Sequence, residues 1–246
     1  MKLAVLGSSS RGNGYLLDNG KEALLIECGC NFDKVKKELK GDILRLCGAI
    51  VSHEHGDHAK HLPQVLGACI PCYMSKGTAE ALKIQDNHFC KQIGTQKAVG
   101  IGGFTIQAFD VRHDAADPFG FLIHHKETGT ILFATDTYYL KYKFKGLNNI
   151  LIECNYRKDI LDDNMAKGRI SIVQRNRVLQ SHLSYQNCLE TLLANDLSKV
   201  NNIVLIHLSD GNSNADEFQQ GIKDATCSNV HIATSGMEIE FNKTPF

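Results

Sequence analysis

The feature that most constrains the fold of this chain is a group of three histidines and one aspartate within six residues. His53, His55, Asp57 and His58 follow closely after the apolar run Cys47–Val51. A short apolar run of this kind predicts a buried strand, so the four side chains are expected on a loop at its end. Imidazole and carboxylate groups are typical ligands of zinc, and manganese and iron accept them too. The segment therefore predicts a metal site, in preference to a solvated histidine-rich loop.

The spacing within this loop indicates more than one ion. His53 and His55 are two residues apart, so in extended chain both side chains point to the same side. Asp57 and His58 lie one turn further on and are expected to face a second ion. This crowding exceeds what a single tetrahedral ion uses. We therefore expect a dinuclear centre.

In three later segments, a residue whose side chain commonly binds metal ions stands at the C-terminal end of an apolar run. His113, Asp136 and His207 each stand at such an end. A single histidine there is more often structural than a ligand, but the early loop needs donors from elsewhere to complete two sites. Asp136, for its part, could merely cap a turn. The expected ligands are His53, His55 and His113 on one ion, Asp57, His58 and His207 on the other, and Asp136 as the bridge.

Length and composition predict one α+β domain over residues 1–246. With 43% hydrophobic residues, the chain can bury a substantial core. Apolar runs typical of strands dominate each half of the chain, with shorter helical patterns interspersed. We therefore expect a sandwich of two sheets covered by helices. The segment Tyr156–Arg177 is polar and poorly periodic, which predicts a helix plus a mobile loop that could cover the site as a lid.

The charge of the chain and its cysteine content limit the cellular location and the binding partners that we expect for the protein. The chain has 27 basic and 27 acidic residues, so no overall field indicates a nucleic-acid partner. No apolar run approaches the length of a membrane span, and the N-terminus does not read as a signal peptide. Nine cysteines without an export signal predict reduced thiols and a cytoplasmic location. The sequence leaves the oligomeric state open, and a homo-oligomer is compatible with it.

A local excess of positive charge follows Asp136. Between Tyr138 and Val178 the chain carries nine Lys/Arg against four Asp/Glu, beginning with an alternation of aromatic residues and lysines. Aromatic rings can stack on bases, and the lysines between them can contact phosphates, so this alternation suits single-stranded nucleic acid. The alternative is an amphipathic edge strand with a solvated loop, since overall neutrality works against strong binding. The residues predicted to touch substrate are Tyr138, Lys141, Lys143 and Lys145.

With these residues laid out, the chain resembles the metallo-β-lactamase-fold hydrolases. The H-x-H-x-D-H signature of that family is matched by His53, His55, Asp57 and His58, and its later single ligands look like His113, Asp136 and His207. The resemblance implies a four-layer αββα sandwich with a dinuclear site at one edge of the sheets. Within the superfamily the likeness is to the YycJ/WalJ-like branch, for example in Gly7–Asn13 and in His113–Pro118.

The resemblance also implies a function. That branch looks like exonucleases directed at single-stranded DNA, and it neighbours the tRNA-processing zinc nucleases. We therefore expect a dinuclear-metal-dependent phosphodiesterase that cleaves single-stranded DNA with a metal-bridging hydroxide, with zinc as the first expectation and manganese as the second. The alternatives are a phosphodiesterase for small cyclic nucleotides, another small-molecule metallohydrolase of the same fold, and a metal-stabilised binding module without activity.

Three residues take their expected roles from the resemblance. Asp57 is expected to be essential for catalysis. His182 is similar in position to a histidine of tRNA-processing relatives that assists leaving-group protonation, so it is the candidate general acid; the alternative is a helix-start histidine with Ser184 as the cap. Glu27 stands where the family usually has an aspartate that braces the ligand loop. We expect Glu27 to support this loop with rearranged hydrogen bonds, and not to be a ligand.

Overall fold

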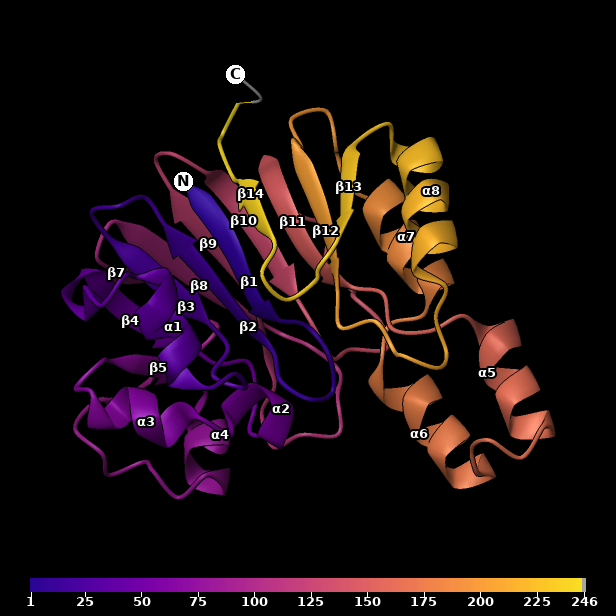
Figure 1. Ribbon diagram of the computed structural model, residues 1–246, viewed down its shortest axis with the longest axis horizontal. Helices are drawn as coiled ribbons and strands as arrows, with labels where there is room; N and C mark the ends of the chain where they lie inside the picture. The colour runs from indigo at the N-terminus through magenta and orange to yellow at the C-terminus, as the bar shows by residue number, and fades with distance from the viewer. Residues whose placement is uncertain (245–246) are drawn as a thin grey trace.

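Two mixed sheets of seven strands each form the centre of the protein (Figure 1). The computed structural model describes residues 1–244, so the last two residues of the domain expected over 1–246 lie outside the described part. The N-terminal sheet has the order β14 (Glu238–Glu240), β1 (Lys2–Gly7), β2 (Gly14–Asp18), β3 (Ala23–Ile26), β4 (Leu46–Ile50), β5 (Cys72–Met74), β6 (Cys90–Gln92). The C-terminal sheet has the order β13 (Asn229–Ile232), β12 (Asn202–Ile206), β11 (Leu147–Glu153), β10 (Gly129–Ala134), β9 (Phe119–His125), β8 (Phe104–Asp110), β7 (Val99–Ile101).

The main hydrophobic core lies between the two sheets. Along β8, Phe104, Ile106 and Ala108 are buried and alternate with less buried residues, as expected for a strand with one covered face. By contrast, β10, β11 and β12 are parallel neighbours and are buried along nearly their whole length. Across the core, the rings of Tyr15 and Phe133 meet with their centroids 5.8 Å apart. Because of this packing, strands of the two sheets end at the same edge of the sandwich.

Helices cover the outer faces of both sheets and complete the four-layer αββα sandwich that was predicted (Figure 1). Against the N-terminal sheet lie α1 (Phe32–Glu38), α3 (Leu62–Gly67) and α4 (Lys76–Ala81). Against the C-terminal sheet lie α7 (Tyr185–Leu193) and α8 (Ala215–Thr226). Two short elements, the 3-10 helix Ile43–Arg45 and α2 (Gly56–Ala59), flank β4. No helix within residues 1–244 combines the length and the apolarity that crossing a bilayer requires.

Two helices project from the sandwich as a helical hairpin, residues 158–181 (Figure 1). α5 (Lys158–Ala166) and α6 (Ile172–Ser181) replace the helix plus mobile loop predicted for Tyr156–Arg177, so that prediction was wrong in its second half. α6 begins with a capping box between Ser171 and Gln174, in which each side chain accepts the other residue's backbone N–H. Only its last residue, Ser181, is buried, so the sequence of α6 carries little of the apolar periodicity that indicates a helix.

The loop of residues 53–58, called here the ligand loop, packs closely against the turn that follows β3. The backbone N–H of Cys28 donates to the carbonyl of His58, and the N–H of Asn13 donates to the carbonyl of Asp57, both at 2.7 Å. A Cβ added at Gly29 would overlap the carbonyl oxygen of Asp57, so only glycine allows this approach. The position of Asp57 therefore depends on a residue without a side chain in another strand connection.

We expect Gly29→Ala to lower the free energy of unfolding by about 3 kcal/mol, the upper end of the usual cost of overpacking, and to weaken metal binding as Asp57 is displaced. Gly56→Ala is the matched control, because a Cβ at this ligand-loop position meets no atom within 4 Å. Urea unfolding of both variants measures the difference. Equal free energies of unfolding for the two variants contradict the close packing.

Candidate metal centre

The seven side chains predicted as metal ligands meet at one edge of the two sheets. The ligand loop follows β4 and runs into α2, whereas the three later residues follow β8, β10 and β12. These three strands run in the same direction, so their C-terminal ends lie at the same edge. The donor atoms of these seven form two groups, each with all atoms within 4.8 Å of one another: His53, His55 and His113 in the first, and Asp57, His58, Asp136 and His207 in the second. A third group of the same kind joins Asp136 and His207 to Glu153 and His182.

In the first group, contacts on the outer side of each ring determine which nitrogen faces inward. Nδ1 of His53 lies 2.9 Å from Oγ of Ser52, and Nδ1 of His113 lies 2.8 Å from the carbonyl oxygen of Ser181. Because a carbonyl oxygen only accepts, Nδ1 of His113 carries the hydrogen and Nε2 presents a lone pair. This Nε2 is 3.0 Å from Nδ1 of His55. The inward nitrogens of the three rings therefore face one another.

In the second group, carboxylate oxygens lie between imidazoles. Oδ2 of Asp57 is 3.0 Å from Nε2 of His207 and 3.3 Å from Nε2 of His58. Oδ2 of Asp136 is 2.8 Å from the same nitrogen of His58 and 3.3 Å from Nε2 of His53. Asp136 thus contacts histidines of both groups, which is the position predicted for a bridging ligand.

Burial and charge determine the protonation of these groups. Burial lowers the pKa of His53 well below its usual range and also lowers the pKa of His113, so both rings are neutral near pH 7. Burial acts to raise the pKa of Asp57, but hydrogen bonds from His207 and His58 hold it well below its usual range. The pKa of Asp136 is also well below its usual range, because the charges of His207 and His58 outweigh its burial. His53 and His113 are thus neutral and both carboxylates ionised, which are the forms that bind divalent metals. The same carboxylates raise the pKa of His58 and His207 against the effect of burial, so these two rings must lose a proton when a metal ion binds.

The cluster fits divalent metal ions. Nε2 of His53 is buried and makes no hydrogen bond among the described residues, although Oδ2 of Asp136 lies 3.3 Å away, and an unpaired buried polar atom is costly. A cation ligated among the three inward nitrogens of the first group would give this atom its partner. The carboxylates of the second group supply the negative charge that such a site needs, and nitrogen with oxygen donors suits zinc and also manganese.

Glu27 lies behind the ligand loop, where a support was predicted. Its buried carboxylate accepts the backbone N–H of Ser52 at 3.2 Å, and Oε2 lies 3.4 Å from Nδ1 of His58. His58 meets Asp57 and Asp136 through its other nitrogen, Nε2. Glu27 thus contacts the outer side of a predicted ligand and belongs to neither group of donors.

Three residues of this region adopt the left-handed backbone conformation that residues other than glycine rarely take. The φ angles of Glu27, Asp136 and His207 are 66°, 46° and 53°. Each stands within two residues of the C-terminal end of a strand, namely β3, β10 and β12. Such a conformation costs roughly 1–3 kcal/mol and persists only where surrounding contacts hold it. The strain is therefore concentrated where the chain turns these side chains toward the cluster.

Three polar residues of the centre were missed by the sequence reasoning. Glu153 is the fully buried last residue of β11, where its carboxylate accepts two backbone N–H groups. Nδ2 of Asn13 lies 3.2 Å from Oδ2 of Asp57, and Nδ2 of Asn155 lies 3.1 Å from Nδ1 of His207. Glu153 carried a signal, because it ends an apolar run just as the predicted ligands do. Asn13 lies in the segment Gly7–Asn13 that carries the family resemblance, although no role was predicted for it, and nothing in the local sequence marks Asn155.

His182 lies beside the two predicted groups of ligands. It ends α6 as its C-cap, and Ser184 caps α7. Nδ1 of His182 is 2.6 Å from Oε1 of Glu153. Burial acts to lower the pKa of His182, but the carboxylates of Glu153 and Asp136 outweigh this and raise the pKa to about 10. The ring is therefore positively charged near pH 7 and is held through Nδ1.

Two cavities open at this centre. The centre cavity, of about 350 Å³, is lined by residues of both groups, by His182 and by α6. The side cavity, of about 800 Å³, extends from His113 between α6 and the segment that follows Asp136. Tyr138 and Lys141 line the side cavity, and their contact with substrate stays a prediction. Lys143 and Lys145 are exposed further along the segment and are not among the lining residues.

Similarity to known proteins identifies the family. A family model described as "Beta-lactamase superfamily domain" matches residues 23–208, which is more than half of the chain. The chain belongs to the β-lactamase superfamily. The matched range contains all seven predicted ligands, from His53 to His207. The chain is a metallo-β-lactamase-fold hydrolase, and its cluster of histidine and aspartate side chains is compatible with divalent metal ions.

Relatives of this superfamily member include proteins named as exodeoxyribonucleases. Exodeoxyribonuclease YycJ of Bacillus anthracis is 26% identical over 225 residues, which cover 85% of this chain and 83% of the relative. Exodeoxyribonuclease WalJ of Streptococcus pneumoniae is 28% identical over 231 residues, with coverage of 86% and 83%.

Solved structures share the fold at lower identity. The metallo-β-lactamase fold protein YhfI from Bacillus subtilis has a TM-score of 0.72 and 20% identity, and the match covers 97% of this chain and 99% of YhfI. The short form of human tRNase Z has a TM-score of 0.61 and 16% identity, with coverage of 98% and 99%. These structures establish the four-layer fold of the chain.

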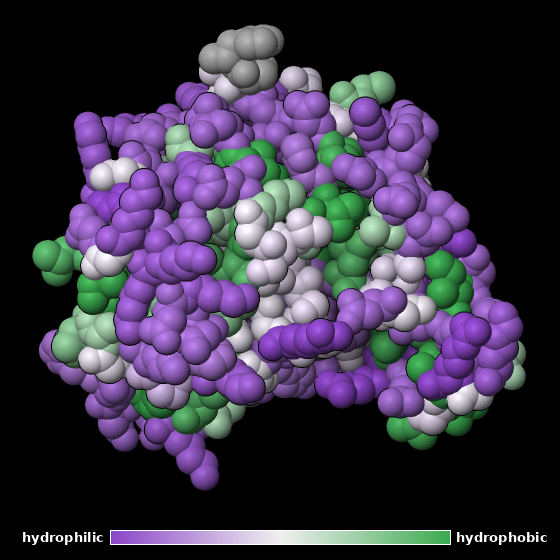
Figure 2. All heavy atoms as spheres, in the orientation of Figure 1, coloured by the Kyte–Doolittle hydropathy of each residue, from purple (hydrophilic) through white to green (hydrophobic). Residues whose placement is uncertain are grey.

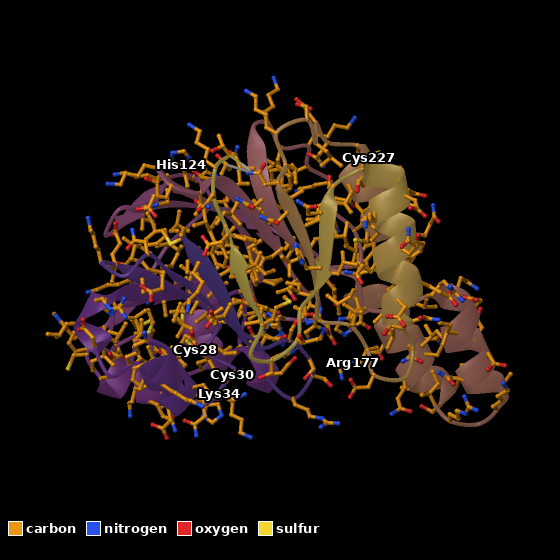
Figure 3. All side chains as sticks on the ribbon, turned by 45° about the horizontal axis from the view of Figure 1, so that its top comes forward. Cys28, Cys30, Lys34, His124, Arg177 and Cys227 are labelled. Carbon is orange, nitrogen blue, oxygen red and sulfur yellow. The ribbon has the colours of Figure 1, made fainter. Side chains whose placement is uncertain are left out.

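We expect the purified protein to hold divalent metal, and His53→Ala to weaken metal affinity by more than about a hundredfold, since even loss of an outer support costs 10–100-fold. His124→Ala is the control, because this exposed histidine lies on β9, far across the molecule from Arg177 beside the centre (Figure 3). Mass spectrometry of the metal content after dialysis against a weak chelator gives the readout. The assignment is wrong if both variants retain the same metal as the wild type.

Proposed function

We propose that the chain is a phosphodiesterase that depends on two divalent ions, with zinc the first expectation and manganese the second, and that it cleaves single-stranded DNA. The observation that carries this proposal is the side cavity of about 800 Å³, which begins at the predicted ligand His113 and is lined by Tyr138, Tyr139 and Lys141. Both tyrosines are exposed, so their rings are free to stack on bases. The exodeoxyribonuclease names of the relatives support the same substrate class.

The predicted ligands would hold two metal ions at the centre. Bound divalent ions would supply Lewis acidity toward the phosphodiester and lower the pKa of a water molecule. His53, His55 and His113 would hold one ion, Asp57, His58 and His207 the other, and Asp136 would touch both. Glu27 lies 3.4 Å behind Nδ1 of His58, and the side-chain amide of Asn13 donates a hydrogen bond to Asp57.

His182 is the proposed general acid. Its Nδ1 is held by Glu153, and its ring lines the centre cavity, so Nε2 is the nitrogen left to face a substrate. Departure of a sugar oxygen from phosphorus requires a proton, and an imidazolium at this position supplies it. Glu153 is the positioning residue in this arrangement, because it orients the ring of His182 and favours its charged form.

A second candidate function rests on the centre cavity alone. Its volume of about 350 Å³ holds a small phosphodiester such as a cyclic nucleotide without use of the side cavity. The two candidates differ in how activity depends on substrate length. A small-molecule phosphodiesterase gains nothing from added nucleotides, whereas a nuclease that uses the side cavity gains with each nucleotide that reaches it.

We expect cleavage of end-labelled single-stranded DNA with added zinc or manganese, with kcat/KM increasing from dinucleotides to octanucleotides. Asp57→Ala should abolish turnover while the far-UV circular dichroism stays that of the wild type, because Asp57 is partly exposed and not part of the core. Gel electrophoresis of the labelled products measures both results. Hydrolysis of cyclic nucleotides without any DNA cleavage would establish the second candidate instead.

We expect His182→Ala to lower kcat on DNA by roughly 10²–10⁴-fold, the usual contribution of general acid catalysis. The loss should be much smaller on bis-p-nitrophenyl phosphate, because p-nitrophenolate departs without a proton. Stopped-assay kinetics on both substrates test this difference. Equal losses on the two substrates indicate that His182 acts only through the structure of the centre.

A further inference from the structure

Arg177 is the residue of α6 that lines both cavities of the centre. Gln174 and Val178 on the same helix line the centre cavity, and Val173 and Gln180 line the side cavity. Figure 3 shows Arg177 near the base of the projecting helical hairpin. Its side chain therefore stands at the junction through which a chain of nucleotides would pass from one cavity into the other.

The present partner of Arg177 is one that a phosphate can replace. Nε of Arg177 donates to Oδ2 of Asp114 at 3.0 Å, and the two side chains are 63% and 45% exposed. Ion pairs this exposed contribute little to stability, so the guanidinium can exchange its partner at small cost. Asp114 directly follows the predicted ligand His113, and its Oδ1 lies 3.4 Å from Nδ1 of that ring. The guanidinium is thus held next to the metal centre before substrate binds.

The distribution of charge singles out Arg177. Within the described residues, Arg177 is the one lysine or arginine that lines the centre cavity. The side cavity adds Arg112 and Lys141, so cations continue outward from the centre. Apolar surface accompanies them, since Val173 is 74% exposed on α6, and Figure 2 shows hydrophobic side chains on the surface of the projecting hairpin. Phosphates and sugars of one strand find cationic and apolar contacts along this path.

We propose that Arg177 is a specificity-determining residue that binds the backbone phosphate next to the scissile phosphodiester. The planar guanidinium offers two parallel donors, which match a phosphate better than a lysine ammonium does. A substrate then needs at least two phosphates, one at the metal ions and one at α6, and this selects oligonucleotides over small phosphodiesters. The inference rests on the proposed nuclease function and names the residue that sets its substrate class.

The test compares Arg177→Gln with Arg169→Gln, an exposed arginine of the same hairpin that bonds to Asn164 and lines neither cavity. For Arg177→Gln we expect the ratio of kcat/KM on an octanucleotide to that on bis-p-nitrophenyl phosphate to fall about 10- to 100-fold, the loss of one charge-assisted hydrogen-bonding pair. Arg177→Lys should recover part of the loss, and Arg169→Gln should keep the ratio of the wild type.

A binding measurement separates this inference from the proposed function. Fluorescence anisotropy of a labelled phosphorothioate octathymidylate, which resists cleavage, on the metal-loaded protein should show weaker binding for Arg177→Gln, with the slope of log affinity against log salt reduced by about one. If wild type cleaves DNA and both glutamine variants match it, the role of Arg177 is refuted and the nuclease proposal stands. If wild type binds the oligonucleotide through Arg177 but cleaves none, the phosphate site stands and the nuclease proposal fails. If wild type neither binds nor cleaves it, both fail.

Discussion

The buried carboxylate of Asp136 is the charge on which the arrangement of the centre depends. Its Oδ2 lies 2.8 Å from His58, 3.3 Å from His53 and 3.8 Å from His113, and the residue is 2% exposed. An ionised carboxylate buried without partners costs many kcal/mol, so it can occupy this position only where imidazoles or cations surround it. His53 and His58 come from the ligand loop after β4 and His113 from the connection after β8, so their meeting at this carboxylate requires both sheets to end at the same edge. The left-handed backbone of Asp136 is tolerated because these contacts hold it.

A second set of contacts fixes which atom of each ring faces inward. Ser52 holds His53, the carbonyl of Ser181 holds His113, and Asn155 lies against His207. The contact to Ser181 has a further consequence, because Ser181 is the last residue of α6. The same helix therefore orients a predicted ligand at its C-terminal end and borders both cavities along its length. A shift of α6 would change the ligand geometry and the substrate path together.

The ligand loop could be predicted from sequence because its donors lie within six residues and follow one apolar run. His113, Asp136 and His207 could be predicted because a strand end is a local signal. The strands β6 and β7 could not, since each has three residues at the outer edge of its sheet. α6 was missed because it buries almost nothing of its own. Asn13 and Asn155 act through tertiary contacts alone, which no local pattern records.

Because the whole chain has no net charge, the binding of an anionic substrate depends on where single charged side chains lie. With 27 basic and 27 acidic residues, no long-range field gathers a polyanion, so the proposed affinity for nucleic acid would have to come from contacts beside the centre. There the acids Asp110 and Asp114 line the side cavity together with the cations Arg112, Lys141 and Arg177. The carboxylates oppose loose binding of any anion, and a phosphate gains only where it displaces Asp114 from Arg177. In the proposed nuclease, this displacement would favour a correctly placed strand over a freely diffusing phosphate, because the strand would already be anchored at the metal centre.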